Sequence, residues 1–330
     1  MNIGIIGAGR IGKLHAKNIV FHFMETNVEA ISDLDLEAAK QCAQKYHIPK
    51  FLVNYHDILN DKSIDAVFIC TPTVTHSQII CECAEAGKHI FCEKPIDINL
   101  ERIDCALEAV KKANVKLQIG FNRRFDPSFI RAKNAIKEGN IGKPYIVRIT
   151  SRDPAPPAPE YIKTSGGLLI DTTIHDFDMC RYLIEDEIQE IYATGDALIE
   201  PTSDLNDIDT VIITIRYRNG AFCTIDNSRK AIYGYDQRIE VFGSEGCINV
   251  DNRYPNSVSL YTADNIQKDL PYHFFLDRYQ KSYIAEERQF IKSIKEDLPT
   301  SPSGLDGKIA VEMGLAAKKS LEEKRTIPFK

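Results

Sequence analysis

NIGIIGAGRIGKLHAKNI, residues 2–19, has the pattern of a strand, a glycine-rich turn and a helix in immediate succession. The apolar residues 3–6 predict the strand, and the spacing Gly7-x-Gly9-x-x-Gly12 follows directly. In this setting the first glycine permits a tight turn, the second lets the backbone approach a pyrophosphate, and the third lets the helix pack on the strand. The helix N-terminus then offers unpaired N–H groups to phosphates. The stretch therefore predicts a dinucleotide-binding Rossmann unit.

The next predicted strand, VEAISD, ends in Asp33, which lies 21 residues after Gly12. An acidic side chain there can accept hydrogen bonds from the adenosine ribose hydroxyls and repels a 2′-phosphate. No arginine follows Asp33 directly, and an unscreened carboxylate facing a phosphate would cost several kcal/mol. We therefore expect NAD rather than NADP. Asp35 suits the N-cap of the helix that begins at Leu36.

Three further apolar strands alternate with helical segments: AVFICT at 66–71, HIFCEK at 89–94 and KLQIGF at 116–121. Continuous apolar strands between helices predict a parallel sheet covered on both faces. Ligands of such sheets bind at the carboxyl ends of the strands. The polar residues at these ends are Thr71, Glu93, Lys94, Asn122, Arg123 and Arg124. A strand-end lysine is usually an incidental surface residue, but the position of Lys94 favours a function.

The second half of the chain changes to a period of two. In DTVIITIRY, residues 209–217, the apolar residues alternate, and Asn219-Gly220 then predicts a hairpin turn. The first half thus predicts an α/β Rossmann domain (1–121) with a doubly wound parallel sheet. In the second half, further strands at 145–153, 237–243, 247–252 and 257–262 predict an α+β domain (122–330) built on a large, mostly antiparallel sheet. Ile212 and Thr214, on the opposite face of their strand, are uncharged, so we expect a partner subunit to cover that face.

GGLLIDTTIHDFDMCRYLI, residues 166–184, predicts one amphipathic helix that also carries four polar residues. Asp171 and His175 are four residues apart, so on a helix they share a face. A stabilising pair on an exposed face is the plain interpretation of such spacing; a catalytic pair is the other. We expect Asp176 and Asp178 to cap the helix or to be solvated.

Composition restricts the class of protein. The 330 residues are 43% hydrophobic and 27% charged, and the formal net charge of −6 argues against nucleic-acid and membrane-surface partners. The sequence shows neither a membrane span nor a signal peptide. The nine cysteines include no C-x-x-C pair, so we expect reduced thiols in a cytoplasmic protein. No zinc-site spacing occurs, and we expect no metal.

The motifs GAGRIGKLHA, CEKP, GFNRRFD, SRDPAPP and SGGLLIDTTIHDFDM occur in this order. They resemble the Gfo/Idh/MocA oxidoreductases over essentially the whole chain. The first two motifs are shared across that superfamily, whereas the later ones, together with YGYDQRIEVFG at 233–243, resemble inositol 2-dehydrogenases. The resemblance implies a role in inositol catabolism: oxidation of myo-inositol to 2-keto-myo-inositol with NAD as acceptor. It also implies a homo-oligomer, usually a homotetramer built on the open sheet.

The resemblance also implies roles for individual residues. Lys94 corresponds to the family's active-site lysine, and Asp171 with His175 to its catalytic pair. The residues implied to contact polyol hydroxyls are Arg123, Arg124, Asp153, Thr172 and Tyr235. Those implied along the cofactor path are Gly7, Gly9, Arg10, Ile11, Gly12, Asp33, Thr71, Thr73, His76, Glu93, Lys94 and Asn122. Some relatives differ at Asn122, and the proline-rich loop after Asp153 varies in length among them.

A mechanism follows from these roles. Hydride transfer from a secondary alcohol requires removal of its hydroxyl proton, and histidine, which ordinarily titrates near neutrality, suits that task. Asp171 would orient the imidazole of His175 or bind a neighbouring hydroxyl, and Lys94 would stabilise the developing alkoxide or pass the proton outward. The alternatives are a relative acting on scyllo-inositol or another sugar or polyol, and a nonenzymatic NAD-binding sensor. A sensor would not need all three residues.

Overall fold

The computed structural model describes residues 1–199 and 207–329, except for the side chain of Thr164. The chain divides into two compact units. Unit 1 consists of Met1–Phe125 and Lys281–Val311, and unit 2 consists of Asp126–Gln280 and Glu312–Lys330. Residues 281–311 therefore complete the unit that the N-terminal residues begin. The division of the chain into functional domains at residue 121 stays a prediction.

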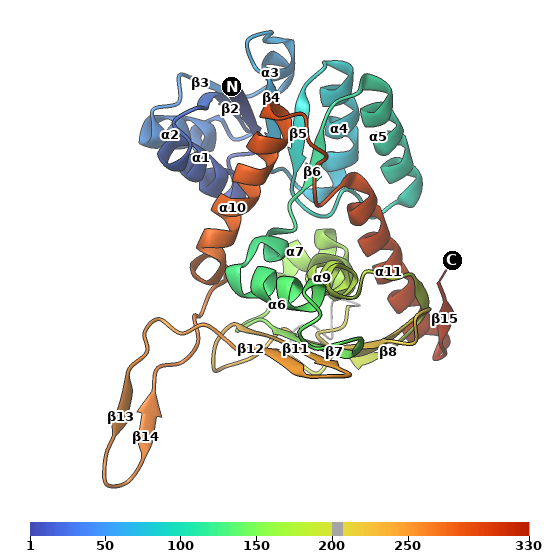
Figure 1. Ribbon diagram of the computed structural model, residues 1–330. Coiled ribbons are helices and arrows are strands. Elements are labelled where there is room, and N and C mark those ends of the chain that lie inside the picture. Colours follow the sequence, from blue (N-terminus) through green and yellow to red (C-terminus); the bar gives the residue numbers. More distant parts are fainter. Residues whose placement is uncertain (200–206, 330) are drawn as a thin grey trace. The chain divides into compact units, whose positions relative to one another are not determined.

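Unit 1 is built on a six-stranded sheet in the order β3-β2-β1-β4-β5-β6, in which every paired strand is parallel (Figure 1). This is the order of a doubly wound dinucleotide-binding fold, as the sequence predicted. The strands are β1 (Asn2–Ile6), β2 (Asn27–Ser32), β3 (Lys50–Leu52), β4 (Ala66–Ile69), β5 (His89–Cys92) and β6 (Leu117–Ile119). The helices between them are α1 (Arg10–His22), α2 (Leu36–Tyr46), α3 (His56–Asn60), η1 (Thr73–Thr75), α4 (His76–Glu85), α5 (Leu100–Ala113) and η2 (Asn122–Phe125).

Apolar side chains cover both faces of this sheet. On one face, residues of β1, β4 and β5 share a core with α1, α2 and α10 (Phe275–Lys295). The rings of Phe68 and Phe91 stack there with centroids 4.6 Å apart, and Phe290 of α10 packs against both. On the other face, Gly4 makes room for Ile58, whose Cγ2 would lie 2.3 Å from an added Cβ. Burial on both faces explains why these strands are continuous apolar runs.

Unit 2 is built on a seven-stranded sheet in the order β12-β11-β7-β10-β9-β8-β15. Only β7 and β10 pair in parallel, and the other pairs are antiparallel, so the predicted mostly antiparallel sheet is confirmed. The strands are β7 (Pro144–Arg152), β8 (Ile188–Asp196), β9 (Thr210–Tyr217), β10 (Phe222–Ser228), β11 (Asp236–Gly243), β12 (Cys247–Val250) and β15 (Ile327–Pro328). A separate hairpin contains β13 (Ser259–Tyr261) and β14 (Ile266–Lys268).

The remaining helices of the chain are α6 (Pro127–Lys137), α7 (Pro159–Ser165), α8 (Gly167–Asp171), α9 (Ile174–Ile184) and α11 (Gly304–Glu323). Helices α6 and α9 contact strands of the seven-stranded sheet. The predicted alternation in β9 is confirmed, because Val211, Ile213, Ile215 and Tyr217 are fully buried on the helix-covered face.

The opposite face of this sheet carries exposed apolar side chains. Ile212 of β9 is 55% exposed, and Phe222 of β10 and Phe242 of β11 are also exposed. Charged pairs lie among them, such as Arg148 with Glu240 at 2.7 Å. Across residues 1–199 and 207–329, no helix combines the length and the apolar character that crossing a membrane requires.

Candidate functional site

The glycine-rich turn has the geometry that the sequence predicted. Gly7 has a φ of +103°, and a Cβ there would lie 2.5 Å from the Cys70 carbonyl oxygen. A Cβ on Gly12 would lie 1.9 Å from the Gly7 carbonyl oxygen, so only glycine lets α1 begin this close to the turn. At Gly9 nothing lies within 4 Å of an added Cβ. The backbone beside Gly9, at the N-terminus of α1, is therefore open to a pyrophosphate.

Asp33 follows directly after β2, and its carboxylate is tied to the same turn. Its Oδ2 accepts a hydrogen bond from the Ala8 N–H at 2.6 Å, and its Oδ1 accepts one from the Asp35 N–H at 2.9 Å. A carboxylate has about four acceptor positions, so ribose hydroxyls can still be bound. The adjacent Leu34 is 90% exposed. Asp35 caps α2 by accepting from the N–H groups of Glu37 and Ala38, as predicted. These residues fit NAD.

Thr71 and Thr73 follow the end of β4 and are partly exposed. Thr71 Oγ1 accepts a hydrogen bond from Thr75 Oγ1 at 2.7 Å. His76, which is also implied on the cofactor path, is almost fully buried, with 1% of its surface exposed. Its two ring nitrogens each lie 2.7 Å from a backbone carbonyl oxygen, one of Pro95 and one of Thr71. Burial lowers the pKa of His76, although the two carbonyls oppose this. Direct contact of His76 with NAD stays a prediction.

Glu93 and Lys94 follow β5, and both are partly buried. Glu93 accepts a hydrogen bond from a histidine that the sequence did not mark as functional, His15 of α1, at 3.0 Å. Three consecutive residues after β6 are buried: Asn122, Arg123 and Arg124. Arg124 donates to Asp306 at 3.0 Å, which lowers the pKa of that carboxyl to about 2 against the opposing effect of burial. Contact of either arginine with substrate remains a prediction.

The predicted single helix over 166–184 is wrong. It consists of two helices, α8 and α9, which are separated at Thr172 and Thr173. The amides of both threonines donate to the Leu168 carbonyl at 3.0 Å, and the Thr173 hydroxyl donates to Asn227 at 2.6 Å. This tertiary hydrogen bond holds the break in place. Asp171 therefore ends one helix, and His175 lies in the first turn of the next.

The polar residues of this segment fall into two groups. Asp171, Thr172 and His175 are partly exposed, whereas Asp176 and Asp178 are buried. The expectation that the last two are solvated is thus wrong. Asp176 accepts a hydrogen bond from the side-chain amide of Asn227 at 2.8 Å and so supports the helix break. Asp171, Thr172 and His175 are therefore the implied site residues of this segment that a ligand can reach.

Tyr161 of α7 is a functional candidate that the sequence analysis missed. Its hydroxyl donates to Asp171 Oδ1 at 2.9 Å, which restrains the carboxylate. The tyrosine lies ten residues before Asp171 on a different helix, so helical spacing gives no signal for the pair. Two other residues implied at the substrate are also in unit 2. Asp153 is partly exposed, and Tyr235 is buried with its ring 6.0 Å from that of Tyr279.

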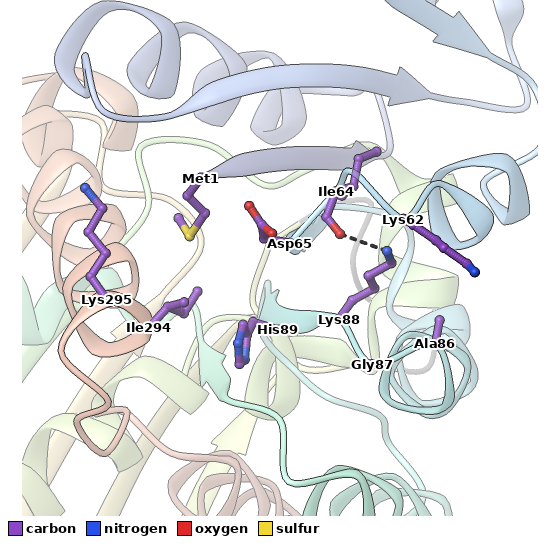
Figure 2. Close-up of a pocket in the computed structure, with 10 residues that line it drawn as sticks. All are labelled: Met1, Lys62, Ile64, Asp65, Ala86, Gly87, Lys88, His89, Ile294 and Lys295. Carbon is purple, nitrogen blue, oxygen red and sulfur yellow. Dashed lines mark hydrogen bonds between the residues drawn. The ribbon is translucent and has the colours of Figure 1, made fainter.

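A hollow of unit 1 lies away from these residues. It has a volume of about 510 Å³ and is lined by Met1, Asp65, Lys88, His89 and others (Figure 2). Met1, Asp65 and Lys88 directly precede β1, β4 and β5, and His89 is the first residue of β5, so the hollow lies at the amino ends of the strands. Ligands of doubly wound sheets bind at the carboxyl ends. The hollow is therefore not the dinucleotide site.

A glycine turn open at its second glycine, an acidic residue after β2 and a doubly wound sheet define an NAD-binding Rossmann protein. The family model described as "Oxidoreductase family, NAD-binding Rossmann fold" matches residues 1–121. The model described as "GFO/IDH/MocA C-terminal domain" matches residues 129–249. The chain belongs to the Gfo/Idh/MocA oxidoreductase family.

The chain is 47% identical to a myo-inositol 2-dehydrogenase of Thermotoga maritima, over 99% of this chain and 98% of the relative. It is 36% identical to a scyllo-inositol 2-dehydrogenase (NAD(+)) of Bacillus subtilis, over 96% and 92% of the two chains. The crystal structure of a probable dehydrogenase from Thermotoga maritima matches with a TM-score of 0.97 and 46% identity, covering 99% of this chain and 98% of that one.

Proposed function

We propose that this protein oxidises a secondary alcohol of a polyol with NAD, and that its substrate is myo-inositol, which becomes 2-keto-myo-inositol. The observation that carries the proposal is the 47% identity with a myo-inositol 2-dehydrogenase over nearly the whole of both chains. The combination of an NAD-type turn with Lys94, Asp171 and His175 supports it. A nonenzymatic NAD sensor would require the turn but none of these three side chains.

In this proposal each polar side chain has one task. NAD, when bound, supplies the hydride acceptor. His175 takes the hydroxyl proton as general base, which is the step that lets the alcohol carbon lose a hydride. Asp171, restrained by the Tyr161 hydroxyl, orients the imidazole or binds a neighbouring hydroxyl. Lys94 stabilises negative charge that develops on the alcohol oxygen.

The side chains implied to bind the substrate fall into a partly exposed group and a buried group. Asp153 and Thr172 are partly exposed in unit 2, so we propose that they bind polyol hydroxyls directly. Arg123, Arg124 and Tyr235 are buried, and a contact between any of them and the polyol would involve one edge of the side chain. The second candidate substrate is scyllo-inositol, favoured by the 36% identity to an NAD-dependent enzyme of that specificity.

We also propose a cytoplasmic homo-oligomer, with a dimer as the minimum and a tetramer as the expected state. The exposed apolar side chains on the outer face of the seven-stranded sheet support the assembly, because a monomer would leave them in water. The nine free cysteines support a reducing compartment.

His175→Ala tests the catalytic assignment. Removal of a general base lowers kcat by roughly 10²- to 10⁴-fold, whereas NAD affinity should stay near the wild-type value, because the glycine turn is unchanged. Asp178→Asn, a substitution at a buried aspartate three residues further along α9, serves as the matched control that alters stability without removing the base. Turnover, NAD affinity and Tm are measured on the same preparations. A folded His175→Ala protein with wild-type kcat would rule out His175 as the base.

A substrate panel tests the reaction itself. Rates of NAD and NADP reduction are measured with myo-inositol, scyllo-inositol, other inositol isomers and aldoses. We expect the highest kcat/KM for myo-inositol with NAD. A higher value for scyllo-inositol would select the second candidate, and no turnover with any polyol would leave the sensor as the better description.

A further inference from the structure

The turn that carries Lys94 is held by groups that the proposed reaction does not use. Glu93 donates its backbone N–H to the Ile69 carbonyl of the neighbouring strand at 3.0 Å. Its carboxylate lies against Gly120, where an added Cβ would be 3.0 Å from Glu93 Oε2. The Glu93 side chain thus has little freedom. Because Lys94 is the next residue, the backbone at which its side chain begins is restrained as well.

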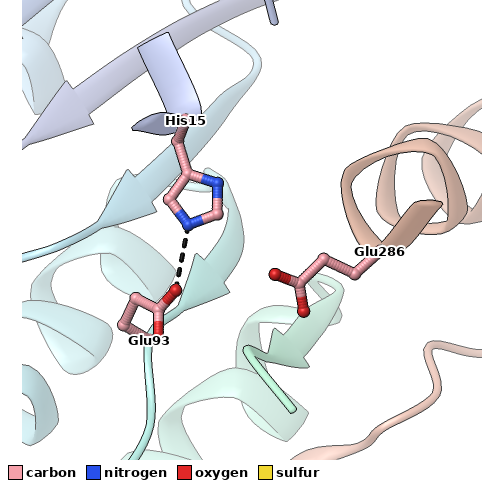
Figure 3. Close-up of side chains that lie close together, drawn as sticks. All are labelled: His15, Glu93 and Glu286. Atoms are coloured by element: carbon pink, nitrogen blue, oxygen red, sulfur yellow. Dashed lines mark hydrogen bonds and ion pairs between the residues drawn. The ribbon is translucent and has the colours of Figure 1, made fainter. Parts of the chain in front are cut away.

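His15 binds this carboxylate from within the core (Figure 3). Its imidazole is fully buried in α1, with the rings of Phe68, Phe91 and Tyr283 around it. Nε2 lies 3.0 Å from Glu93 Oε1, and Nδ1 lies 2.7 Å from Glu287 Oε1. Burial alone would lower the pKa of His15, but the hydrogen bonds to Glu287 and Glu93 outweigh it and raise the pKa to about 9. His15 is therefore an imidazolium at neutral pH and donates to both carboxylates.

Helix α10 supplies the other end of this chain of contacts. Glu287 of α10 accepts hydrogen bonds from His15 and from the side-chain amide of Asn18 at 3.1 Å. Both donors lie on α1, the helix that begins at the glycine turn. The contacts therefore link the cofactor-binding helix, α10 and the turn after β5 through one buried cation.

His76 holds the same turn from its other side. One ring nitrogen lies 2.7 Å from the carbonyl oxygen of Pro95, the residue after Lys94, and the other lies 2.7 Å from that of Thr71. His76 is almost fully buried, so it cannot exchange these carbonyls for water. Lys94 is thus flanked along the chain by two residues, Glu93 and Pro95, each of which contacts a buried histidine.

A metal ion is the competing interpretation of this cluster. His15, Glu93 and Glu286 offer ligand atoms that all lie within 4.8 Å of one another, and Glu286 points toward the other two (Figure 3). Neither oxygen of Glu286 has a hydrogen-bond partner among the residues that the structure describes. A cation would need the Nε2 lone pair of His15, which is protonated, and an ionised Glu286. Burial and the charges of Glu93 and Glu287 raise the pKa of Glu286 well above its ordinary value. Burial thus favours the neutral carboxyl of Glu286, and a neutral carboxyl beside a protonated imidazole is a poor set of ligands for a cation.

We propose that His15 and His76 are positioning residues that fix the Lys94 ammonium by holding Glu93 and Pro95 on either side of it. The proposal rests on the function proposed above, in which Lys94 acts on the substrate oxygen. A misplacement of about 1 Å in a reacting group costs on the order of 100-fold in rate. Loss of either histidine should therefore lower kcat without removing any group that touches the substrate.

A double-mutant cycle with Lys94→Ala tests the proposal. We expect His15→Gln and His76→Gln each to lower kcat by about 10- to 100-fold, and we expect His15→Gln to change NAD affinity by less than about threefold. In the Lys94→Ala background the same substitutions should leave the residual kcat unchanged, because residues acting through one group are non-additive. If either histidine only stabilises the fold, its substitution would lower kcat by the same factor in both backgrounds, and the proposal would fall.

Lys88→Met is the matched control. Lys88 is buried and donates to the carbonyls of Asp61 at 2.7 Å and Ile64 at 2.8 Å, the second of which Figure 2 shows. Like His76, it is a buried side chain that binds two backbone carbonyls in unit 1, but it lies at the amino ends of the strands. We expect Lys88→Met to lower Tm and to leave kcat at the wild-type value.

The chemical reactivity of Lys94 tests the positioning role without measuring turnover, so the test does not depend on the proposed function. With NAD bound, trace acetylation by isotopically labelled acetic anhydride reports the reactivity of Lys94 relative to the exposed Lys62, quantified by mass spectrometry. We expect His15→Gln and His76→Gln to change the Lys94 ratio, and Lys88→Met to leave it unchanged. His76→Gln alters no charged pair, so it still provides the test if His15→Gln does not fold. An unchanged Lys94 ratio in a folded variant would overturn the positioning role, even if no polyol proves to be a substrate.

Discussion

At the scale of single residues, Asp33 has two tasks that the sequence pattern did not separate. Its carboxylate accepts the Ala8 N–H of the glycine turn, so it shapes the turn in addition to the ribose contact that we propose for it. A substitution that removes every acceptor at this position would disturb the turn and confound any change in cofactor choice. Serine retains a hydroxyl acceptor, and the exposed Leu34 beside it can be replaced without loss of packing.

Asp33→Ser combined with Leu34→Arg is therefore expected to shift preference toward NADP. The double variant removes a carboxylate that repels the 2′-phosphate and supplies a guanidinium that pairs with it. The ratio of kcat/KM for NADP to that for NAD should rise by at least about tenfold, which corresponds to roughly 1.4 kcal/mol. Leu34→Arg alone is the control and should give a smaller shift. An unchanged ratio in the double variant would show that Asp33 does not face the ribose.

At the scale of elements, two glycines of the same turn are expected to have different roles, Gly12 in folding and Gly9 in cofactor binding. Gly12→Ala would place a Cβ 1.9 Å from the Gly7 carbonyl oxygen, whereas Gly9→Ala meets no protein atom within 4 Å. We expect Gly12→Ala to lower Tm strongly and Gly9→Ala to leave Tm unchanged. Gly9→Ala should still weaken NAD binding by at least about tenfold, because its Cβ occupies the space beside the pyrophosphate. Thermal melts and NAD titrations decide this, and unimpaired binding by Gly9→Ala would place the pyrophosphate elsewhere.

The elements that the sequence predicted correctly are those whose burial repeats regularly. The strands β1, β4 and β5 are mostly apolar and almost fully buried, and the burial of β9 alternates. β8 was not predicted, because a register shift between Ile188 and Glu190 breaks its alternation. The break between α8 and α9 was missed for a different reason. It depends on hydrogen bonds to Asn227, which lies more than fifty residues away in sequence, and local spacing carries no information about such contacts.

The candidate site shows the same limit. The residues in motifs, such as Gly12 and Asp33, lie where the sequence predicted, because their roles depend on the backbone beside them. Tyr161 and His15 were missed, because each acts through a partner on another element. For His15, the only indication in the sequence was a histidine among the core-facing residues of α1.

At the scale of the whole molecule, the proposed homo-oligomer would assemble through the outer face of the seven-stranded sheet. We expect Ile212→Asp with Phe242→Glu to shift the protein toward monomer, because each places a charge on an apolar area that a second copy would bury. Light scattering at micromolar concentration measures this against the monomer mass of 37.3 kDa. Met24→Glu, at a fully exposed position of unit 1, is the control. A wild-type protein that is itself monomeric would contradict the proposed assembly.

Stability should fall at alkaline pH. The pKa of His15 is raised from 6.5 to about 9 in the folded protein, so its contribution is fully present below pH 6.5 and is lost as the pH rises through 9. The shift corresponds to roughly 3 kcal/mol. The raised pKa values of Glu286 and Glu287 act in the same direction, because burial makes their ionisation costly. Urea unfolding between pH 6 and pH 10 measures the loss.

Glu286→Gln provides the comparison for this pH dependence. The amide resembles the neutral carboxyl in shape but cannot ionise, so the variant should lose less stability than the wild type between pH 7 and pH 10. The pH dependence that remains belongs to His15. A wild-type protein with constant stability over this range would contradict the raised pKa of His15.

The path of the chain through unit 1 has a consequence for how the protein is made. All six strands of the nucleotide-binding sheet have been synthesised by residue 125, but Phe290 and Glu287, which complete one of its faces and bind His15, belong to residues 281–311. At about 5–20 residues per second the ribosome needs roughly ten to thirty seconds to add them. During that interval the nascent sheet exposes Phe68 and Phe91 and keeps His15 without its main counter-charge. A messenger truncated late in the reading frame would therefore yield a chain with every cofactor motif intact and an unfinished nucleotide-binding unit.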